Sequence, residues 1–115
     1  MYQYAAKVRR VVDGDTVDLD VDLGFMVTIT QRFRLDGINA PEMTGLTREQ
    51  GKVAKAGLEA LLNKASLGVI YVDSTGKDKY GRWIAKLSFV SSSDGSVVDV
   101  SQKLVAEELA AVKTY

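Results

Sequence analysis

The segment from Arg34 to Glu42 brings an arginine and a glutamate to the two ends of one short turn. It follows a strand-like run and contains Pro41, the only proline in the sequence. A guanidinium group matches phosphate oxygens through paired hydrogen bonds, and phosphate chemistry needs groups of these two kinds. The remaining elements of the chain must position them.

The composition removes several kinds of chemistry at once. The sequence has no cysteine and no histidine, which excludes thiol nucleophiles, disulfides, zinc sites of the usual kind and imidazole acid–base catalysis. Any reaction must therefore use carboxylates, guanidinium, ammonium or hydroxyl groups, or a hard cation. Hard cations take carboxylate, carbonyl and water oxygens, which such a chain can supply.

Length and charge set further limits. A chain of 115 residues predicts one domain, residues 1–115, with one core. No apolar run approaches the roughly 18 residues needed to cross a bilayer, so we expect a soluble monomer with no membrane partner. No secretion leader is visible, which predicts an intracellular protein. The formal net charge of zero argues against coating nucleic acid by charge alone, although a local basic patch can still form.

Alternating residues predict three strands in the first third of the chain, at 2–12, 15–23 and 26–35. Asp15 shares the parity of the apolar residues of the second strand, which points it toward the core. Arg34 lies on the face opposite Phe33, so Arg34 can meet Asp15 only if the strands coil or bulge near their ends.

A helix is predicted at about residues 48–65, where apolar side chains recur at helical spacing and Thr47 is a plausible N-cap. Gly51 and Gly57 each cost this helix about 1 kcal/mol relative to alanine, so packing must stabilise it. The rest of the chain predicts two strands, at 69–73 and 82–90, separated by a polar loop at 74–79, and a last helix that Asp99 or Ser101 can cap and that ends near Val112.

Five strands with one helix between the third and fourth predict an α+β, mostly β fold. The order is that of a five-stranded Greek-key barrel of the oligonucleotide-binding (OB-fold) kind, with a C-terminal helix. A five-stranded α+β domain of another topology fits the same order of elements.

Each candidate residue has an ordinary structural explanation when it is taken alone. Asp13-Gly14 is a common turn, and Asp15 beside it can be a solvated carboxylate. Arg34 can be a surface arginine, and Glu42 after proline can favour the start of the next helix. The combination of these residues favours a functional site.

Three segments in order resemble the thermonuclease family, that is, staphylococcal nuclease and its relatives. They are Val12 to Val17, Phe33 to Glu42 with its Arg34 and Pro41, and Asp78 to Arg82. The resemblance continues through Val100 to Val105, so it covers nearly the whole chain.

The resemblance implies a barrel that hydrolyses phosphodiesters of DNA or RNA with one calcium ion. Asp15 would be a metal ligand, and Glu42 would activate or orient the attacking water. Arg34 and Arg82 would hold the scissile phosphate and its developing charge. Lys79, Tyr80 and Tyr115 match positions that would contact a nucleotide, preferentially in a single strand.

Two residues depart from the family pattern. Asn39 stands where the family commonly has a second metal-binding aspartate, and its amide oxygen can coordinate an ion but carries no charge. Ala40 follows, and would contribute its backbone carbonyl to the metal. Fewer charged ligands generally weaken calcium binding, so we expect a lower affinity for Ca²⁺, or use of Mg²⁺ or another divalent ion.

Three functions are compatible with the sequence. The first is a divalent-metal-dependent nuclease, which uses Asp15, Arg34, Glu42 and Arg82 together. The second is a non-catalytic nucleic-acid-binding OB-fold domain, which Asn39 and the neutral net charge favour. The third is a protein-interaction domain in which Asp18, Asp20 and Asp22 form a partner surface, although a solvated strand face explains these carboxylates equally well.

Overall fold

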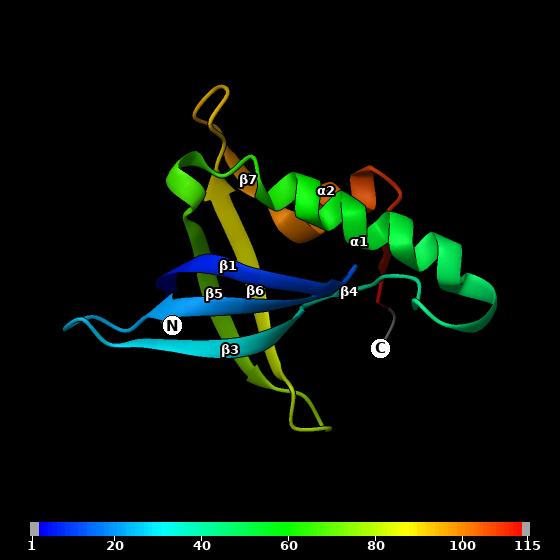
Figure 1. The fold of residues 1–115 in the computed structure, drawn as a ribbon, viewed down its shortest axis with the longest axis horizontal. Helices are drawn as coiled ribbons and strands as arrows, with labels where there is room; N and C mark the ends of the chain where they lie inside the picture. Colours follow the sequence, from blue (N-terminus) through cyan, green and yellow to red (C-terminus); the bar gives the residue numbers. More distant parts are fainter. Residues whose placement is uncertain (1–2, 114–115) are drawn as a thin grey trace.

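The structure is a computed structural model in which residues 3–113 are described, apart from the side chain of Thr75 (Figure 1). The elements follow in the order β1 (Gln3–Asp13), β2 (Thr16–Asp22), β3 (Thr28–Leu35), β4 (Ile38–Asn39), η1 (Gly45–Thr47), α1 (Arg48–Leu62), η2 (Ser66–Gly68), β5 (Ile70–Lys77), β6 (Trp83–Val90), β7 (Val97–Asp99), α2 (Val100–Ala106) and β8 (Ala111–Val112).

Five strands close into a barrel. They are hydrogen-bonded in the order β3-β2-β1-β5-β6, with β7 added to β6. A parallel pairing of β3 with β6 closes the ring and places Phe33, Arg34 and Leu35 beside Trp83, Ile84 and Ala85. The predicted α+β fold with a five-stranded barrel of the OB kind is therefore confirmed.

The barrel interior and the helix faces that cover it form one apolar core. Strand alternation and helical periodicity produce it, because the apolar parity of each strand points inward. Helix α1 contacts β1 and α2, and α2 contacts β6, so both helices lie on the same side of the barrel in Figure 1. Within the described residues, no helix is long and apolar enough to cross a bilayer. The largest fully buried side chains are those of Phe89, Leu19, Leu35, Leu58, Ile70, Leu87 and Leu104.

The prediction of a polar loop at 74–79 is wrong, because β5 continues to Lys77. Its pairing with β6 shifts register between Ser74 and Gly76, and Gly76 has a φ of 114° that favours glycine. This bulge lets polar residues stay in the ladder while the strand bends.

The last helix ends at Ala106, so its predicted extension to Val112 is also wrong. Glu108 has a φ of 59°, and Ala111 and Val112 then pair with Asn39 and Ile38. These residues form the two-stranded β4–β8 sheet, which ties the C-terminal segment to the turn after β3. Asp99 caps α2 as predicted, since its carboxylate accepts a hydrogen bond from the N–H of Gln102.

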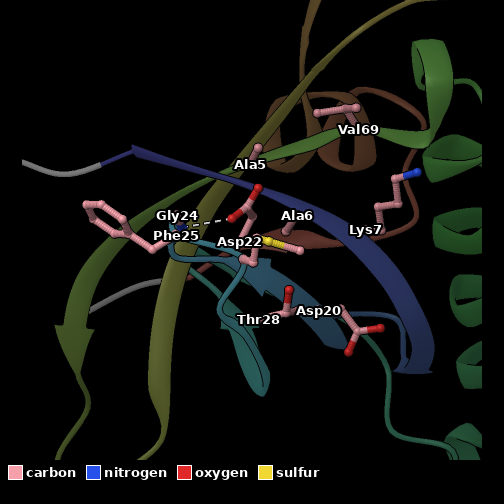
Figure 2. Close-up of a pocket in the computed structure, with 10 residues that line it drawn as sticks. Ala5, Ala6, Lys7, Asp20, Asp22, Gly24, Phe25, Thr28 and Val69 are labelled. Carbon is pink, nitrogen blue, oxygen red and sulfur yellow. Dashed lines mark hydrogen bonds between the residues drawn. The ribbon is translucent and has the colours of Figure 1, made fainter.

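The β2–β3 hairpin ends in a tight turn that displaces the predicted start of the third strand from Met26 to Thr28. Gly24, Phe25 and Met26 all have positive φ values, and Val27 N–H donates to the Gly24 carbonyl over 2.9 Å. Phe25 and Met26 are fully exposed. Figure 2 shows the Phe25 ring extending away from the other labelled side chains.

The acidic residues of β2 have partners within the hairpin. Asp18 accepts hydrogen bonds from Arg32 at 2.8 and 3.2 Å. Asp20 accepts one from the Thr30 hydroxyl, and Asp22 accepts one from the N–H of Gly24. Asp18 and Asp20 thus form cross-strand pairs, which stabilise neighbouring strands, while Asp22 stabilises the turn that follows β2.

Candidate active site

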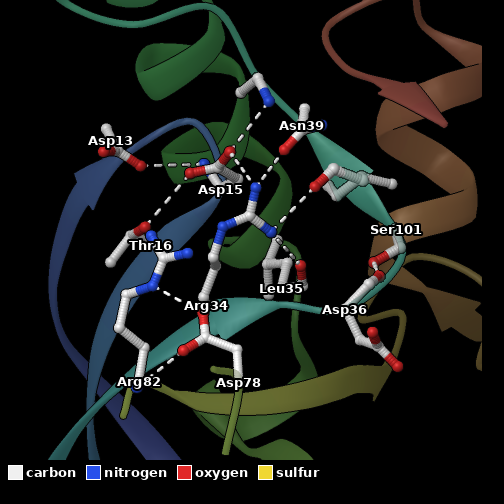
Figure 3. Close-up of polar contacts among 12 residues, drawn as sticks. Asp13, Asp15, Thr16, Arg34, Leu35, Asp36, Asn39, Asp78, Arg82 and Ser101 are labelled. Carbon is white, nitrogen blue, oxygen red and sulfur yellow. Dashed lines mark hydrogen bonds and ion pairs between the residues drawn. The ribbon is translucent and has the colours of Figure 1, made fainter. Parts of the chain in front are cut away.

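Arg34 lies at the centre of a network of polar contacts (Figure 3). Its Nη1 donates to the carbonyl oxygens of Leu35 and Ile38 over 3.1 and 3.0 Å. Its Nη2 donates to Asp15 Oδ2 over 3.4 Å and to Asn39 Oδ1. The Arg34 side chain is only 11% exposed, so the guanidinium is held in one orientation.

Asp15 lies in the turn between β1 and β2, ahead of the strand in which it was predicted. Strand alternation does not apply there, and its carboxylate turns toward Arg34 instead of the core. The Asp15 carbonyl accepts a hydrogen bond from Leu35 N–H at 2.8 Å, and Oδ2 accepts one from Ala40 N–H at 2.9 Å. The β1–β2 ladder also shifts register between Val11 and Asp13, which bends the chain next to Asp15.

Burial raises the pKa of the Asp15 carboxyl above its usual value. The Asp13 side chain raises this pKa further, while the Ala40 N–H and the Arg34 guanidinium lower it in part. Asp13 Oδ1 also accepts a hydrogen bond from Asp15 N–H at 3.1 Å. Two neighbouring carboxylates with little solvent form a place where an additional positive charge is stabilising.

Arg82 approaches the same region from the loop between β5 and β6. Its Nε donates to Asp78 Oδ2 over 2.7 Å, and its backbone N–H donates to Asp78 Oδ1 over 3.0 Å. Its guanidinium carbon lies 5.3 Å from the centre of the Tyr80 ring, and the Lys79 amine lies 5.2 Å from the same ring centre. Arg82 is 52% exposed, so its outer nitrogens can reach a ligand.

A pocket of about 460 Å³ gathers these side chains. Its size lies within the range typical of small-ligand sites. More basic than acidic side chains line it, which favours an anionic ligand. The charged and aromatic residues that line it are Arg34, Asp36, Asp78, Lys79, Tyr80, Arg82 and Lys113.

The backbone of Glu42 is fixed, whereas its side chain is exposed. The Thr47 hydroxyl donates to the Glu42 carbonyl over 2.8 Å and makes no capping bond to α1, although Thr47 occupies the predicted N-cap position. A Cβ atom added to Gly51 would lie 2.5 Å from the Glu42 carbonyl oxygen, so only glycine allows α1 to approach this closely. Within the described residues, the Glu42 carboxylate has no hydrogen bond or ion pair.

Gly14 permits a second close approach near the site. A Cβ atom there would lie 2.7 Å from the Cβ atoms of both Ala40 and Ala54. The β1–β2 turn, the segment after β4 and α1 therefore meet at Gly14, and this contact positions Asp15 beside Ala40.

The oxygen atoms of Asp15 and Asn39 converge, since both accept from Arg34 Nη2. They supply a carboxylate and an amide oxygen, two of the donor types that calcium takes. Among residues 3–113, however, no three His, Cys, Asp or Glu side chains form a group that could hold a metal ion. The donor types fit a hard cation, and the low number of charged donors predicts weak binding.

The structure brings most of the predicted residues into two adjoining groups. Asp15 and Asn39 contact Arg34, and Ala40 contacts Asp15 through its N–H. Lys79, Tyr80 and Arg82 share the pocket with Arg34. Glu42 lies two residues beyond Ala40 without contacting either group, and Tyr115 lies outside the described residues.

Sequence reasoning left out two acidic partners of the predicted residues. The sequence indicates only a turn at Asp13, whereas its carboxylate lies beside Asp15. The sequence indicates no separate role for Asp78, whereas its carboxylate holds Arg82. Their position two residues before Asp15 and four before Arg82 is the signal that could have identified them.

A comparison with protein families identifies the family of the chain. The family model described as staphylococcal nuclease homologue matches residues 32–115, which include Arg34, Asn39, Glu42 and Arg82 but not Asp15. No curated protein sequence matches the chain. Because the matched segment covers well over half of the sequence, the chain belongs to the family of staphylococcal nuclease homologues.

Proposed function

We propose that this protein is a divalent-metal-dependent phosphodiesterase that hydrolyses DNA or RNA. The observation that carries the proposal is the pocket shared by Arg34 and Arg82, which come from elements far apart in the sequence. Two guanidinium groups, with Lys79 and Tyr80 beside them, suit a phosphate and its attached nucleoside.

Arg34 and Arg82 would bind the scissile phosphate and stabilise the charge that develops on it. Arg34 is held by backbone carbonyls and by Asp15 and Asn39, so little reorganisation is needed when charge develops. Arg82 is oriented by Asp78 and keeps its outer nitrogens exposed. Arg34 would thus make a fixed contact with the phosphate, and Arg82 an adjustable one.

Glu42 would take the proton from the attacking water. Its carboxylate makes no bond in the described structure, while its backbone is fixed by Thr47 and by the approach of α1 at Gly51. Because the backbone is fixed, the carboxylate stays near one position. Because the carboxylate makes no other bond, it can accept a proton without first breaking a contact.

Asp15, Asn39 and the Ala40 carbonyl would hold the divalent ion, Ca²⁺ or Mg²⁺. When bound, such an ion polarises the phosphoryl oxygen and neutralises developing negative charge. The oxygen donors and the extra stabilisation that Asp15 and Asp13 would gain from a cation support this assignment.

The proposal is tested by cleavage of a fluorescent single-stranded oligonucleotide with calcium, with magnesium and with chelator side by side. We expect cleavage only with a divalent ion. Glu42→Gln should reduce cleavage by about 10²- to 10⁴-fold while binding is retained, and Arg82→Ala should reduce it by about 10²- to 10³-fold. Normal turnover by Glu42→Gln would refute the role of this glutamate.

The chain offers matched controls for both variants. Arg32 is 56% exposed and bonds Asp18 at 2.8 Å, much as Arg82 bonds Asp78, but it does not line the pocket. Glu49 is an exposed carboxylate in the first turn of α1. Arg32→Ala and Glu49→Gln should therefore leave cleavage unchanged.

A non-catalytic nucleic-acid-binding domain is the second candidate. Asn39 favours this candidate. Arg34 Nη2 donates to the oxygens of both Asn39 and Asp15, so a metal ion would have to displace the guanidinium. A neutral amide attracts the metal ion less than a carboxylate would. Oligonucleotide binding that is equal with and without chelator, in the absence of cleavage, would support this candidate.

A further inference from the structure

A second hollow, of about 560 Å³, opens at the mouth of the barrel. Residues of the strands and of their ends line it, and their side chains are mostly apolar or aromatic. None of the described lining residues is charged. The principal ones are Tyr4, Leu23, Ile29, Phe33, Val72 and Trp83, and we call this hollow the mouth groove.

The mouth groove has large apolar side chains in contact with solvent. Leu23 is 40% exposed, Ile29 43% and Trp83 37%. Contiguous exposed apolar surface on a soluble protein usually marks a binding site. The volume is within the range of pockets that bind small organic groups, which is large enough for a nucleobase.

The mouth groove and the candidate active site are adjacent. The last rungs between β3 and β6 form the wall between them, because Phe33 and Trp83 line the groove while Arg34 and Ile84 line the pocket. This wall ends at Trp83, the first residue of β6, and Arg82 precedes it directly. A nucleic-acid strand whose phosphate is bound at Arg82 can therefore pass around the end of this wall and reach the groove.

Charge and ring geometry favour a nucleobase in the mouth groove. The Lys77 amine lies over one face of the Trp83 ring, 4.9 Å from its centre, so a base would stack on the other face with a cation close by. Bases stack on such rings while neighbouring cations contact the phosphates. By contrast, the hollow lined by β1 and the β2–β3 hairpin has two carboxylates, Asp20 and Asp22, against one cation, Lys7, a balance that disfavours a phosphate chain (Figure 2).

We propose that the mouth groove binds an unpaired base of the same single-stranded nucleic acid whose phosphate lies at Arg34 and Arg82. This inference rests on the proposed function and extends it, since it makes an unpaired strand longer than one nucleotide the preferred substrate. Trp83 is the stacking residue, and Leu23 and Ile29 form the apolar edge of the subsite.

Trp83 is the only tryptophan in the sequence, so its fluorescence reports directly on the groove. In chelator, which prevents cleavage, a single-stranded oligonucleotide of about eight nucleotides, within the site size of OB folds, should quench this fluorescence. The same sugar–phosphate chain carrying no bases should bind more weakly and leave the fluorescence unquenched. Binding of the base-bearing strand without quenching would overturn the proposal.

Trp83→Leu should weaken binding of a dye-labelled oligonucleotide by about 5- to 150-fold, the range expected for loss of one stacking contact. Tyr71→Leu is the matched control, because Tyr71 is 36% exposed and lies outside the groove. It should bind with unchanged affinity. Leu23→Gln leaves Trp83 in place and should weaken both binding and quenching, which tests the groove even if Trp83→Leu does not fold.

The outcomes separate this proposal from the nuclease proposal. An oligonucleotide that binds and quenches Trp83 but is not cut supports the groove and refutes the nuclease. Cleavage without quenching refutes the groove alone. A free protein that dimerises with Trp83 shielded would show that a second copy occupies the groove, and would also overturn the proposal.

Discussion

Under the proposed function, Asn39 would decide how a divalent ion competes with Arg34 at the candidate site. Its amide oxygen and the Asp15 carboxylate share one guanidinium nitrogen. Asn39→Asp adds a charged donor, and charge count is a main determinant of calcium affinity. We therefore expect calcium to bind about tenfold more tightly or better, as calorimetric titration can measure.

The control for Asn39→Asp is Asn63→Asp, which adds the same charge at the exposed C-cap of α1. It should leave calcium affinity unchanged. If calcium affinity rose equally in both variants, the cause would be the change in net charge. That result would contradict a role for Asn39 in binding the ion.

The Asp18–Arg32 pair makes a pH-dependent contribution to stability. The hydrogen bond from Arg32 lowers the pKa of the Asp18 carboxyl below its usual value. Because this pKa is lower in the folded than in the unfolded protein, the stabilisation is fully present above the unfolded pKa and is lost as the pH falls through the folded one. Arg32→Gln should return the Asp18 pKa toward its ordinary value, as NMR titration of the carboxyl carbon can show.

Urea unfolding supplies the second measurement for this pair. Arg32→Gln should be less stable than the original protein near neutral pH, and the two should converge in acid. Arg48→Gln, which changes an exposed arginine of α1, should have no such pH-dependent effect. A difference that persists in acid would mean that Arg32 stabilises the fold by another route.

At the scale of elements, the two glycines of α1 have different reasons to be glycine. Alanine at either position would favour the helix by about 1 kcal/mol on propensity alone. A Cβ at Gly51 would meet the Glu42 carbonyl oxygen at 2.5 Å, whereas a Cβ at Gly57 would meet the end of the Leu109 side chain at 2.4 Å. Backbone cannot move aside as a flexible side chain can.

Gly51→Ala should therefore lower both thermal stability and the proposed nuclease activity, because α1 must move away from the Glu42 segment. Gly57→Ala should cost less stability and leave activity unchanged, since Leu109 can change rotamer. Thermal melts and cleavage rates of the two variants check this. Similar losses of activity in both would show that α1 does not position Glu42.

The elements with strong periodicity could be predicted from the sequence. The strict alternation around Leu19 and the helical spacing of Leu58 and Leu61 identify a strand and a helix because one face of each must be buried. The predicted barrel then follows from their order. Asp99 is found as a cap because its short carboxylate suits a helix start.

The differences occur where long-range contacts decide the structure. The β4–β8 pairing ends the last helix early, and no local pattern in Ala111 and Val112 indicates a partner at Ile38. Likewise, Asp15 and Arg34 meet because Asp15 lies in a turn next to a bulge, a geometry that alternation alone cannot determine. The polar residues around Gly76 predict a loop, but a bulge at Gly76 keeps them in β5, and their local pattern does not indicate this bulge.

At the scale of the whole molecule, the formal charge is zero while the pocket is basic. Arg34, Lys79, Arg82 and Lys113 line it, so single-stranded nucleic acid should bind with a salt dependence set by these four cations. The expected slope of log affinity against log salt is about −0.7 per neutralised phosphate, or roughly −3 in total.

This slope can be measured by titrating oligonucleotide at several salt concentrations with chelator present. Arg82→Ala should make the slope shallower by about 0.7, while Arg32→Ala should leave it unchanged because Arg32 lies outside the pocket. A slope near zero would mean that the pocket does not bind phosphates.

The short parallel pairing of β3 with β6 also orders events during folding. Only the rungs from Phe33 to Leu35 join these strands, yet they bring together residues about fifty positions apart in the chain. Contacts between such distant residues form late, because the loop between them must first lose its freedom. The hairpins and α1 can form before that step, but Arg34 and Arg82 cannot share a pocket until it is complete. The newly made chain therefore acquires its candidate site only as the barrel closes, and has no preformed site while it is still partly unfolded.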